Sequence, residues 1–148
     1  MMLKAILASF ALILSCNAMA TCKQGSETVF SCTTEKDKLI EVCDAKKTIN
    51  YSFGKATAKP EIVVRAPRNS VTTTQWAGIG RWMSYSVNIP NGNTVYNVFW
   101  AVDRLADEHP IEAGVNVQIN KKLVATVQCA GEQHIVQNID GIKLNAAK

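Results

Sequence analysis

The sequence predicts an all-β fold, an antiparallel β-sandwich or small β-barrel of about eight or nine strands stapled by disulfides. Three observations support this prediction. Apolar residues recur at every second position in most segments of the chain. Glycine, proline, asparagine and aspartate separate these segments at short intervals. No segment has the apolar spacing of a long amphipathic helix.

The first twenty residues have the order of a secretory signal peptide. Lys4 precedes an apolar run over residues 5–14, and Ala18-Met19-Ala20 has the small residues of a cleavage site. The run is too short to span a bilayer comfortably, so no transmembrane segment is predicted. We expect residues 1–20 to be removed and residues 21–148 to form a single exported, soluble domain, periplasmic or secreted.

Cys16 offers a second possibility for processing. The sequence Ile13-Leu14-Ser15-Cys16 loosely resembles a bacterial lipobox, which would make Cys16 a lipid-bearing first residue. Ordinary cleavage is preferred because Ile13 and Ser15 are less common at their positions in a lipobox, whereas the site at Ala20 is a good one.

Four cysteines follow the signal peptide: Cys22, Cys32, Cys43 and Cys129. In an exported domain they predict two disulfides, with three possible pairings. Because Cys129 is far from the other three, one bridge must tie the C-terminal half to the N-terminal segment. No Cys-x-x-Cys occurs and the chain has only two histidines, so neither a metal site nor a cofactor is predicted.

The N-terminal half contains four predicted strands. Segments 28–32 and 39–43 flank the polar residues 33–38 as in a hairpin. The next strand, 48–53, alternates and is expected to end at Gly54. A short apolar strand follows between Pro60 and Pro67.

Residues 82–101 predict the core hairpin, with Asn91-Gly92 as a two-residue turn. That turn sets Val87 opposite Tyr96, Tyr85 opposite Val98 and Met83 opposite Trp100, which makes one face apolar. On the other face Trp82 and Phe99 become diagonal neighbours away from the turn. They are either covered by a loop or sheet edge, or form an exposed aromatic contact patch.

Residues 115–129 predict a second hairpin across a loop at 120–122, with Cys129 turned inward. A last strand is expected within 134–144. Residues 103–110 are a candidate for one helical turn before Pro110.

The least regular part of the chain runs from Arg65 to Arg81. It contains Arg65, Arg68, Trp76 and Arg81, and arginine and tryptophan are enriched at binding hot spots. Long loops on a rigid β scaffold often carry binding function. In the alternative interpretation, residues 70–76 form another strand and Trp76 belongs to the core.

Catalytic chemistry is not predicted. The chain lacks the Gly-x-Ser-x-Gly and His-Glu-x-x-His motifs. His109 and His134 are expected to be ordinary solvated side chains, and the acidic residues around 107–112 a solvated loop. The net charge of +4 is mild and scattered, which gives no footprint for nucleic acid.

An export signal, a disulfide-stapled β fold and the lack of a catalytic set together resemble the general plan of small bacterial periplasmic inhibitors of lysozyme. The c-type inhibitors among them carry a Ser-Gly-x-x-Tyr loop that enters the lysozyme cleft. This chain has no Ser-Gly pair, so no residue role is carried over from them.

Three functions are therefore considered. The first is an envelope protein that binds and neutralises a protein target, such as a cell-wall hydrolase or a toxin, through the loop at 65–81. The second is a small-ligand module for carbohydrate or lipid, with Trp82 and Phe99 as a stacking platform. The third, a hydrolase with an unrecognised site, is disfavoured by the missing motifs.

Overall fold

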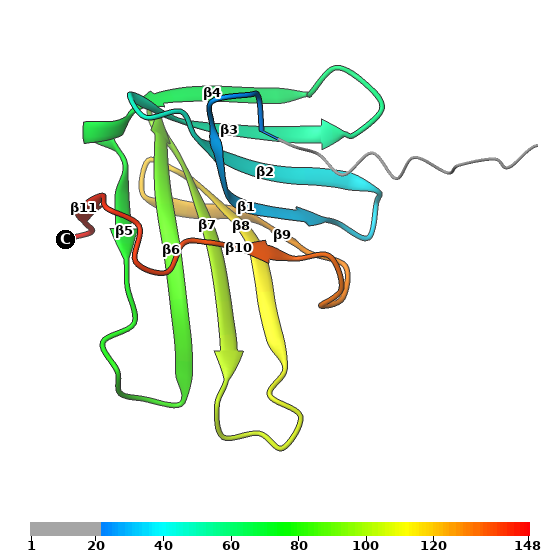
Figure 1. Cartoon of the computed structure of the whole chain (residues 1–148), viewed down its shortest axis with the longest axis vertical. Helices are drawn as coiled ribbons and strands as arrows, with labels where there is room; N and C mark the ends of the chain where they lie inside the picture. The colour runs from blue at the N-terminus through cyan, green and yellow to red at the C-terminus, as the bar shows by residue number, and fades with distance from the viewer. Residues whose placement is uncertain (1–21) are drawn as a thin grey trace, which may run out of the picture.

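The chain folds as a sandwich of two β-sheets, as predicted, and does not close into a barrel (Figure 1). The structure is a computed structural model, and it describes residues 22–148. The predicted signal peptide and Cys16 lie outside these residues. In Figure 1 the strands of the smaller sheet run across those of the larger one at a steep angle.

The smaller sheet is antiparallel, in the order β10-β1-β2-β3-β4. Its strands are β1 (Glu27–Thr33), β2 (Lys38–Asp44), β3 (Thr48–Lys55), β4 (Ile62–Pro67) and β10 (Val136–Gln137). The predicted first hairpin is confirmed as β1 and β2. The expected end of β3 at Gly54 is wrong, because the strand continues to Lys55. Gly54 lies so close to the next segment that a Cβ there would be 2.8 Å from the Glu61 nitrogen.

The larger sheet has the order β11-β5-β6-β7-β8-β9, antiparallel except where β11 runs parallel to β5. Its strands are β5 (Thr72–Thr74), β6 (Trp82–Asn91), β7 (Thr94–Asp103), β8 (Ile111–Ile119), β9 (Lys122–Gln128) and β11 (Asn145–Ala146). The eleven strands of the described chain exceed the predicted count because β10 and β11 have only two residues each. A 3-10 helix, η1 (Arg68–Ser70), joins β4 to β5. Residues 104–110 form bends and turns, so the predicted helical turn there is wrong.

The core hairpin, β6 and β7, has the predicted apolar face but a different register. Ile89 pairs with Tyr96, Val87 with Val98, and Tyr85 with Trp100. This register is two residues away from the predicted one, so each side chain keeps its face. The turn residues are Gly92 and Asn93, and Gly92 has φ 62°. Because Asn91 pairs with Thr94, Gly92 is the first central residue of the turn and Asn93 the second, and positive φ at the first position alone is typical of a type II′ turn.

The β8–β9 hairpin places Val115 opposite Val127 and Val117 opposite Ala125, on the predicted face. Its turn has two residues, Asn120 and Lys121, rather than the predicted three. Both take positive φ, 50° and 66°, as a tight hairpin turn can require. A register shift after Val117 compensates for the shorter turn.

The inner faces of the two sheets enclose the hydrophobic core. Phe30, Ile40 and Tyr51 come from the smaller sheet, and each is at most 1% exposed. The rings of Tyr51 and Tyr96 stack across the sheets with centroids 4.7 Å apart. Residues 138–144 cross from β10 to β11 and bury Ile139 completely, so this segment links one edge of each sheet.

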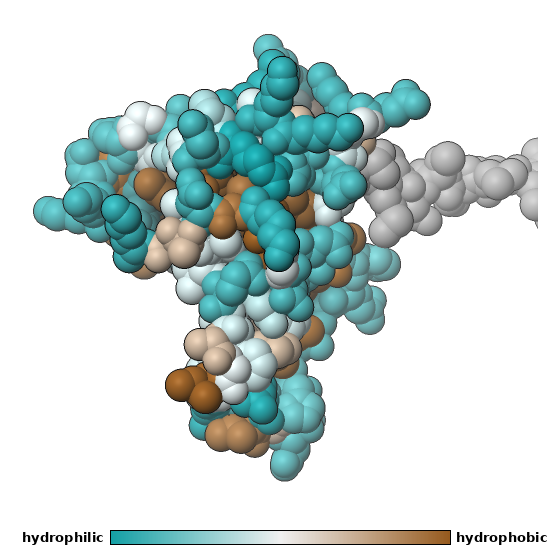
Figure 2. Space-filling view, turned by 60° about the vertical axis from the view of Figure 1, so that its left-hand side comes forward, coloured by the Kyte–Doolittle hydropathy of each residue, from teal (hydrophilic) through white to brown (hydrophobic). Residues whose placement is uncertain are grey.

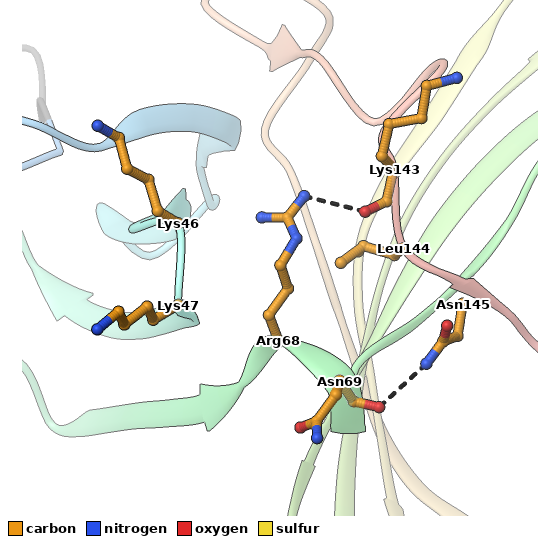
Figure 3. Close-up of a pocket in the computed structure, with 7 residues that line it drawn as sticks. All are labelled: Lys46, Lys47, Arg68, Asn69, Lys143, Leu144 and Asn145. Atoms are coloured by element: carbon orange, nitrogen blue, oxygen red, sulfur yellow. Dashed lines mark hydrogen bonds between the residues drawn. The ribbon is translucent and has the colours of Figure 1, made fainter.

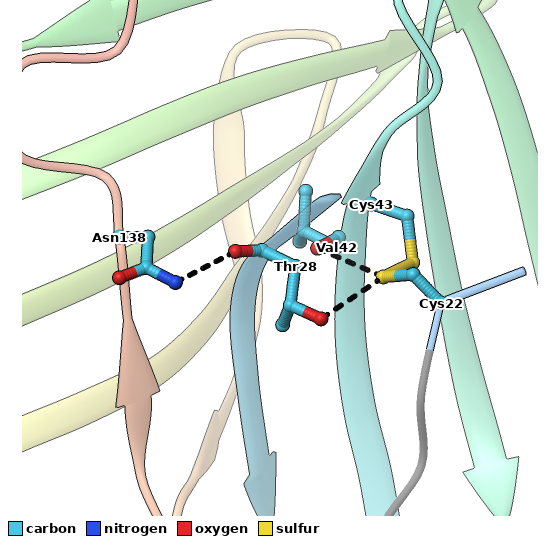
Figure 4. Close-up of a disulfide and its surroundings, with 5 residues drawn as sticks. All are labelled: Cys22, Thr28, Val42, Cys43 and Asn138. Carbon is cyan, nitrogen blue, oxygen red and sulfur yellow. Dashed lines mark hydrogen bonds between the residues drawn. A yellow bond between two sulfur atoms is a disulfide. The ribbon is translucent and has the colours of Figure 1, made fainter. Parts of the chain in front are cut away.

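Two disulfides form, Cys22–Cys43 and Cys32–Cys129. The predicted link from Cys129 to the N-terminal segment is therefore confirmed. Figure 4 shows the Cys22–Cys43 bridge, where the Thr28 hydroxyl donates to the Cys22 sulfur at 3.4 Å. Disulfides persist outside the reducing cytoplasm, and the two bridges indicate such a compartment for this chain.

A row of polar side chains crosses five strands on the outer face of the larger sheet. The Asn88 amide donates to Thr72, the Asn97 amide to Asn88, the Asn116 amide to Asn97, and the Thr126 hydroxyl to Asn116. We call these five residues the asparagine ladder. Each member lies directly opposite the next in the strand pairing, so the ladder runs straight across the sheet.

Glu41 lies in the middle of the smaller sheet with one carboxylate oxygen, Oε2, buried and unpartnered. Burial raises the pKa of this carboxyl. The amide oxygen of Asn50, its diagonal neighbour across β2 and β3, is also buried without a partner. The ionised form of Glu41 is therefore destabilised in the folded protein.

Replacing Glu41 with glutamine is expected to increase the free energy of unfolding at pH 7 by about 1 kcal/mol or less. Because folding raises the pKa of Glu41, the ionised side chain destabilises the folded protein above that pKa. This destabilisation disappears as the pH falls below the pKa of glutamate in the unfolded chain, about 4.3. Urea unfolding of Glu41→Gln between pH 4 and pH 8 measures this gain. Glu35→Gln, at an exposed turn, is the control, and an equal gain from it would contradict the assignment to Glu41.

Candidate functional site

The predicted binding loop, 65–81, is not one loop in the structure. Arg65 lies in β4 opposite Asn50, and Arg68 lies in η1. The short strand β5 then separates both from Trp76 and Arg81. The alternative prediction of a strand at 70–76 is right for Thr72–Thr74, and Trp76 is half-buried against the core from the loop that follows. The four candidates therefore divide between two ends of β5.

Trp76 and Arg81 belong to a projecting part of the molecule that we call the tip. The tip consists of residues 75–81, between β5 and β6, and residues 104–110, between β7 and β8. Both connections lie at the lower end of the larger sheet in Figure 1. Figure 2 shows this end as a narrow projection below a wider body, with hydrophobic residues on its surface.

The tip exposes two large aliphatic side chains. Ile79 is 80% exposed and Leu105 is 71% exposed, one from each connection. Trp82, the first residue of β6, is 39% exposed beside them. An exposed apolar side chain is unremarkable when single, but a group on a projecting surface is typical of an interaction site.

Two arginines brace the tip. The Arg81 guanidinium donates to both carboxylate oxygens of Asp103, at 2.6–2.9 Å. Arg104 donates from its guanidinium to the Gly80 carbonyl at 3.1 Å and from its backbone to the Arg81 carbonyl at 3.0 Å. These bonds join the two connections of the tip.

Trp76 completes the bracing from inside the tip. Its indole nitrogen donates to the Ile79 carbonyl at 3.0 Å, which holds the backbone beneath the exposed isoleucine. The Arg104 guanidinium lies over the indole ring, 4.7 Å from its centroid, in a cation–π arrangement. Trp76 thus holds the backbone beneath the exposed residues, and its own side chain is partly exposed.

Asp103 is the buried acceptor at the centre of the bracing. Besides Arg81, the backbone amides of Leu105 and Ala106 donate to it at 3.0 and 3.3 Å. The hydrogen bond from Arg81, helped by these amides, holds the pKa of Asp103 below its usual range. A carboxylate with this many donors fixes the turn that presents Leu105.

Replacing Asp103 with asparagine is expected to lower the melting temperature at pH 7 and to speed proteolysis within 104–110. Because the folded pKa is lowered, the stabilisation is present above the unfolded value, about 3.9, and is lost as the pH falls through the folded value. The wild type and Asp103→Asn should therefore converge in acid. Thermal melts from pH 2 to pH 7 measure this, with Asp107→Asn, at an exposed position of the tip, as the control. A constant difference across this range would contradict the role of the Asp103 charge.

The register separates the predicted aromatic pair. Trp82 pairs with Asp103, whereas Phe99, four residues before Asp103 in β7, pairs with Ser86 and Gly114. They are therefore not diagonal neighbours, and only Trp82 adjoins the tip. Phe99 instead lies half-buried on the outer face of the larger sheet, on the same side as Asn97 of the asparagine ladder.

Within residues 22–148, one group of side chains has the spacing of metal ligands: Cys22, Glu41 and Cys43. The two sulfurs are joined in a disulfide, so they cannot act as thiolate ligands. His109 is exposed, and its Nδ1 lies 3.1 Å from the Asp103 carbonyl oxygen. His134 is an exposed residue of a turn with φ 67°.

At the other end of β5 from the tip, the structure forms a hollow that sequence reasoning missed. We call it the basic cleft, and it is lined by Lys46, Lys47, Arg68, Asn69, Lys143 and Asn145. Figure 3 shows Lys46 and Lys47 on one side, Lys143 on the other, and Arg68 between them. Lys143 follows Lys47 by 96 residues, so only the Lys46-Lys47 pair is visible as a sequence signal.

In comparisons with protein-family models, curated proteins and solved structures, nothing matches this chain. In the described part of the chain, no helix has the length and apolar character needed to cross a membrane.

Proposed function

We propose that this protein is an exported binding protein that engages and neutralises a protein target through the tip. The observation that carries the proposal is the pair of exposed aliphatic side chains, Ile79 and Leu105, on two loops joined by hydrogen bonds. A target of the cell-wall hydrolase or toxin class fits an exported protein with this kind of surface.

The physical basis is preorganisation. Loops that must be ordered on binding lose conformational entropy, and this loss weakens affinity. Here Arg81, Arg104 and Asp103 already hold both loops, so the aliphatic residues can enter a pocket with little further ordering. The charge of Arg81 is compensated by its ion pair with Asp103, so the proposed contact depends on the two aliphatic side chains.

One observation favours a second candidate, the binding of a neutral carbohydrate. Phe99 lies on an open sheet face beside Asn97, with Ser86 and Gly114 opposite, and none of these residues is charged. An aromatic ring next to amide groups can stack on a sugar and bond its hydroxyls. The Phe99 face and the tip are separate surfaces, so one set of variants can distinguish them.

Site-specific photo-crosslinking tests the proposal. A photoreactive amino acid replaces Ile79 in one variant and Val124, an exposed residue of β9, in the matched control. The proposal expects a discrete crosslinked species in extracts of the native compartment at position 79 and none at position 124. Equal crosslinking at both positions, or none at position 79 together with binding of a neutral oligosaccharide, would overturn the assignment to the tip.

A further inference from the structure

The basic cleft is a substantial hollow built by three separate segments. Its volume is about 680 Å³, and it lies where the β2–β3 turn, η1 and residues 143–145 meet. Leu144 supplies an apolar part of the wall between the polar groups (Figure 3). A hollow of this size can accommodate a small charged molecule or the end of a longer one.

Arg68 holds the three segments together. Its guanidinium donates to both carboxylate oxygens of Asp44, at the end of β2, and to the Lys143 carbonyl at 3.0 Å. Its backbone amide donates to the Lys47 carbonyl at 3.0 Å. The cleft is thus fixed in the folded protein before any ligand arrives.

The turn that carries the two adjacent lysines is also fixed. Lys46 has φ 67°, and its backbone amide donates to the Asp44 carboxylate at 2.9 Å. The Asp44 side chain therefore orders both the turn and Arg68, and it neutralises the charge of Arg68 through the ion pair. Glu27, opposite Asp44 on β1, is a second carboxylate in this region, and it lines an adjoining hollow together with Lys46.

Three ion pairs are present within residues 22–148, and none of them includes Lys46, Lys47 or Lys143. The cleft therefore has an excess of about three positive charges at neutral pH. Beyond Arg68 the groove changes character, because Glu27 and Asp140 line its continuation. An anion should therefore favour the lysine-lined side of Arg68, although Lys46 and Lys143 also border the hollows that contain Glu27.

We propose that the basic cleft binds a multiply charged anion that carries phosphate groups, either free in solution or as the headgroups of a membrane. In Figure 3 the ammonium groups of Lys46, Lys47 and Lys143 point away from Arg68. Lysine is a point charge on a flexible stem, so these three groups can turn toward the several oxygens of a bound polyphosphate. The proposal goes beyond the proposed function, since the cleft and the tip occupy opposite ends of β5 and each can fail separately.

The test uses inorganic tripolyphosphate as the probe, measured by isothermal titration calorimetry at low ionic strength, and vesicles with and without phosphatidylglycerol. We expect one tripolyphosphate per chain, with binding that weakens as salt is added. Binding to the vesicles but not to tripolyphosphate would identify headgroups as the source of the phosphate. Lack of binding to both would overturn the proposal.

The chain supplies a closely matched control. Lys46 and Lys121 both have left-handed backbone, with φ 67° and 66°, and each precedes another lysine. Lys46→Gln with Lys47→Gln should weaken binding about tenfold or more, and Lys143→Gln should weaken it as well. Lys121→Gln with Lys122→Gln, which removes the same charge from the β8–β9 turn, should change it less than about twofold. Equal weakening by the two double variants would show that binding follows net charge alone, and would overturn the proposal.

Discussion

Removing the Cys32–Cys129 disulfide, as Cys32→Ala with Cys129→Ala, is expected to lower the free energy of unfolding by about 4–5 kcal/mol. The two cysteines are 97 residues apart, so the bridge restricts most of the unfolded chain. The Cys22–Cys43 bridge closes a segment of only 21 residues, and its removal is expected to cost about 3 kcal/mol in the same chain-entropy treatment. The difference follows from loop length alone.

Urea unfolding of the two double variants measures this difference. The wild type without and with reductant provides the two reference states. A larger loss from the Cys22–Cys43 variant would contradict the loop-length account and would show that the N-terminal bridge has a further role. A loss equal to the whole stability of the domain would prevent folding, and circular dichroism of the Cys32–Cys129 variant detects that outcome directly.

Replacing Ile79 and Leu105 with aspartate is expected to weaken binding of the crosslinked target by about 100-fold or more. Each side chain is mostly exposed in the free protein, and its burial against a partner would contribute about 1.5–3 kcal/mol. A carboxylate at either position would instead be buried without a partner. Folding should be unaffected because both residues already face solvent.

The matched control places aspartate at Leu123 and Val124 on β9, which are 61% and 55% exposed. Surface plasmon resonance with the immobilised target compares the two double variants, and thermal melts confirm that both are folded. The tip variant alone should lose binding. Loss of binding in the β9 variant with the tip variant unchanged would move the interface to the edge of the larger sheet.

The sequence predicts the strands and their faces well because period-two alternation depends only on burial. The apolar face of the core hairpin is right even though the register is wrong by two residues, since a two-residue shift leaves every side chain on its own face. The sequence predicts Asn91 and Gly92 as the two turn residues, whereas the strand pairing makes Gly92 the first turn residue and Asn93 the second. Turn type is decided by backbone geometry that the apolar pattern does not contain.

Only part of the functional surfaces could be predicted, because both depend on contacts between distant segments. The sequence predicts Trp76 and Arg81 as binding candidates. The residues that contact them, Arg104 and Asp103, lie more than twenty residues later in the chain. Arg68 was identified, yet Lys143 meets it from 75 residues away. Neither pairing leaves a signal in local spacing, so the tip and the basic cleft become visible only in the folded chain.

The asparagine ladder has a consequence for the alignment of the tip. With the predicted offset, Asn88 would stand opposite Val95 and Trp82 opposite Ala101, and both the amide row and the pairing of Trp82 with Asp103 would be lost. The apolar face tolerates either offset, so the amides of Asn88 and Asn97 discriminate where burial does not. Their hydrogen bond in the middle of the sheet selects the register of β6 and β7. It therefore determines which residues pair at the far end of these strands, next to the tip.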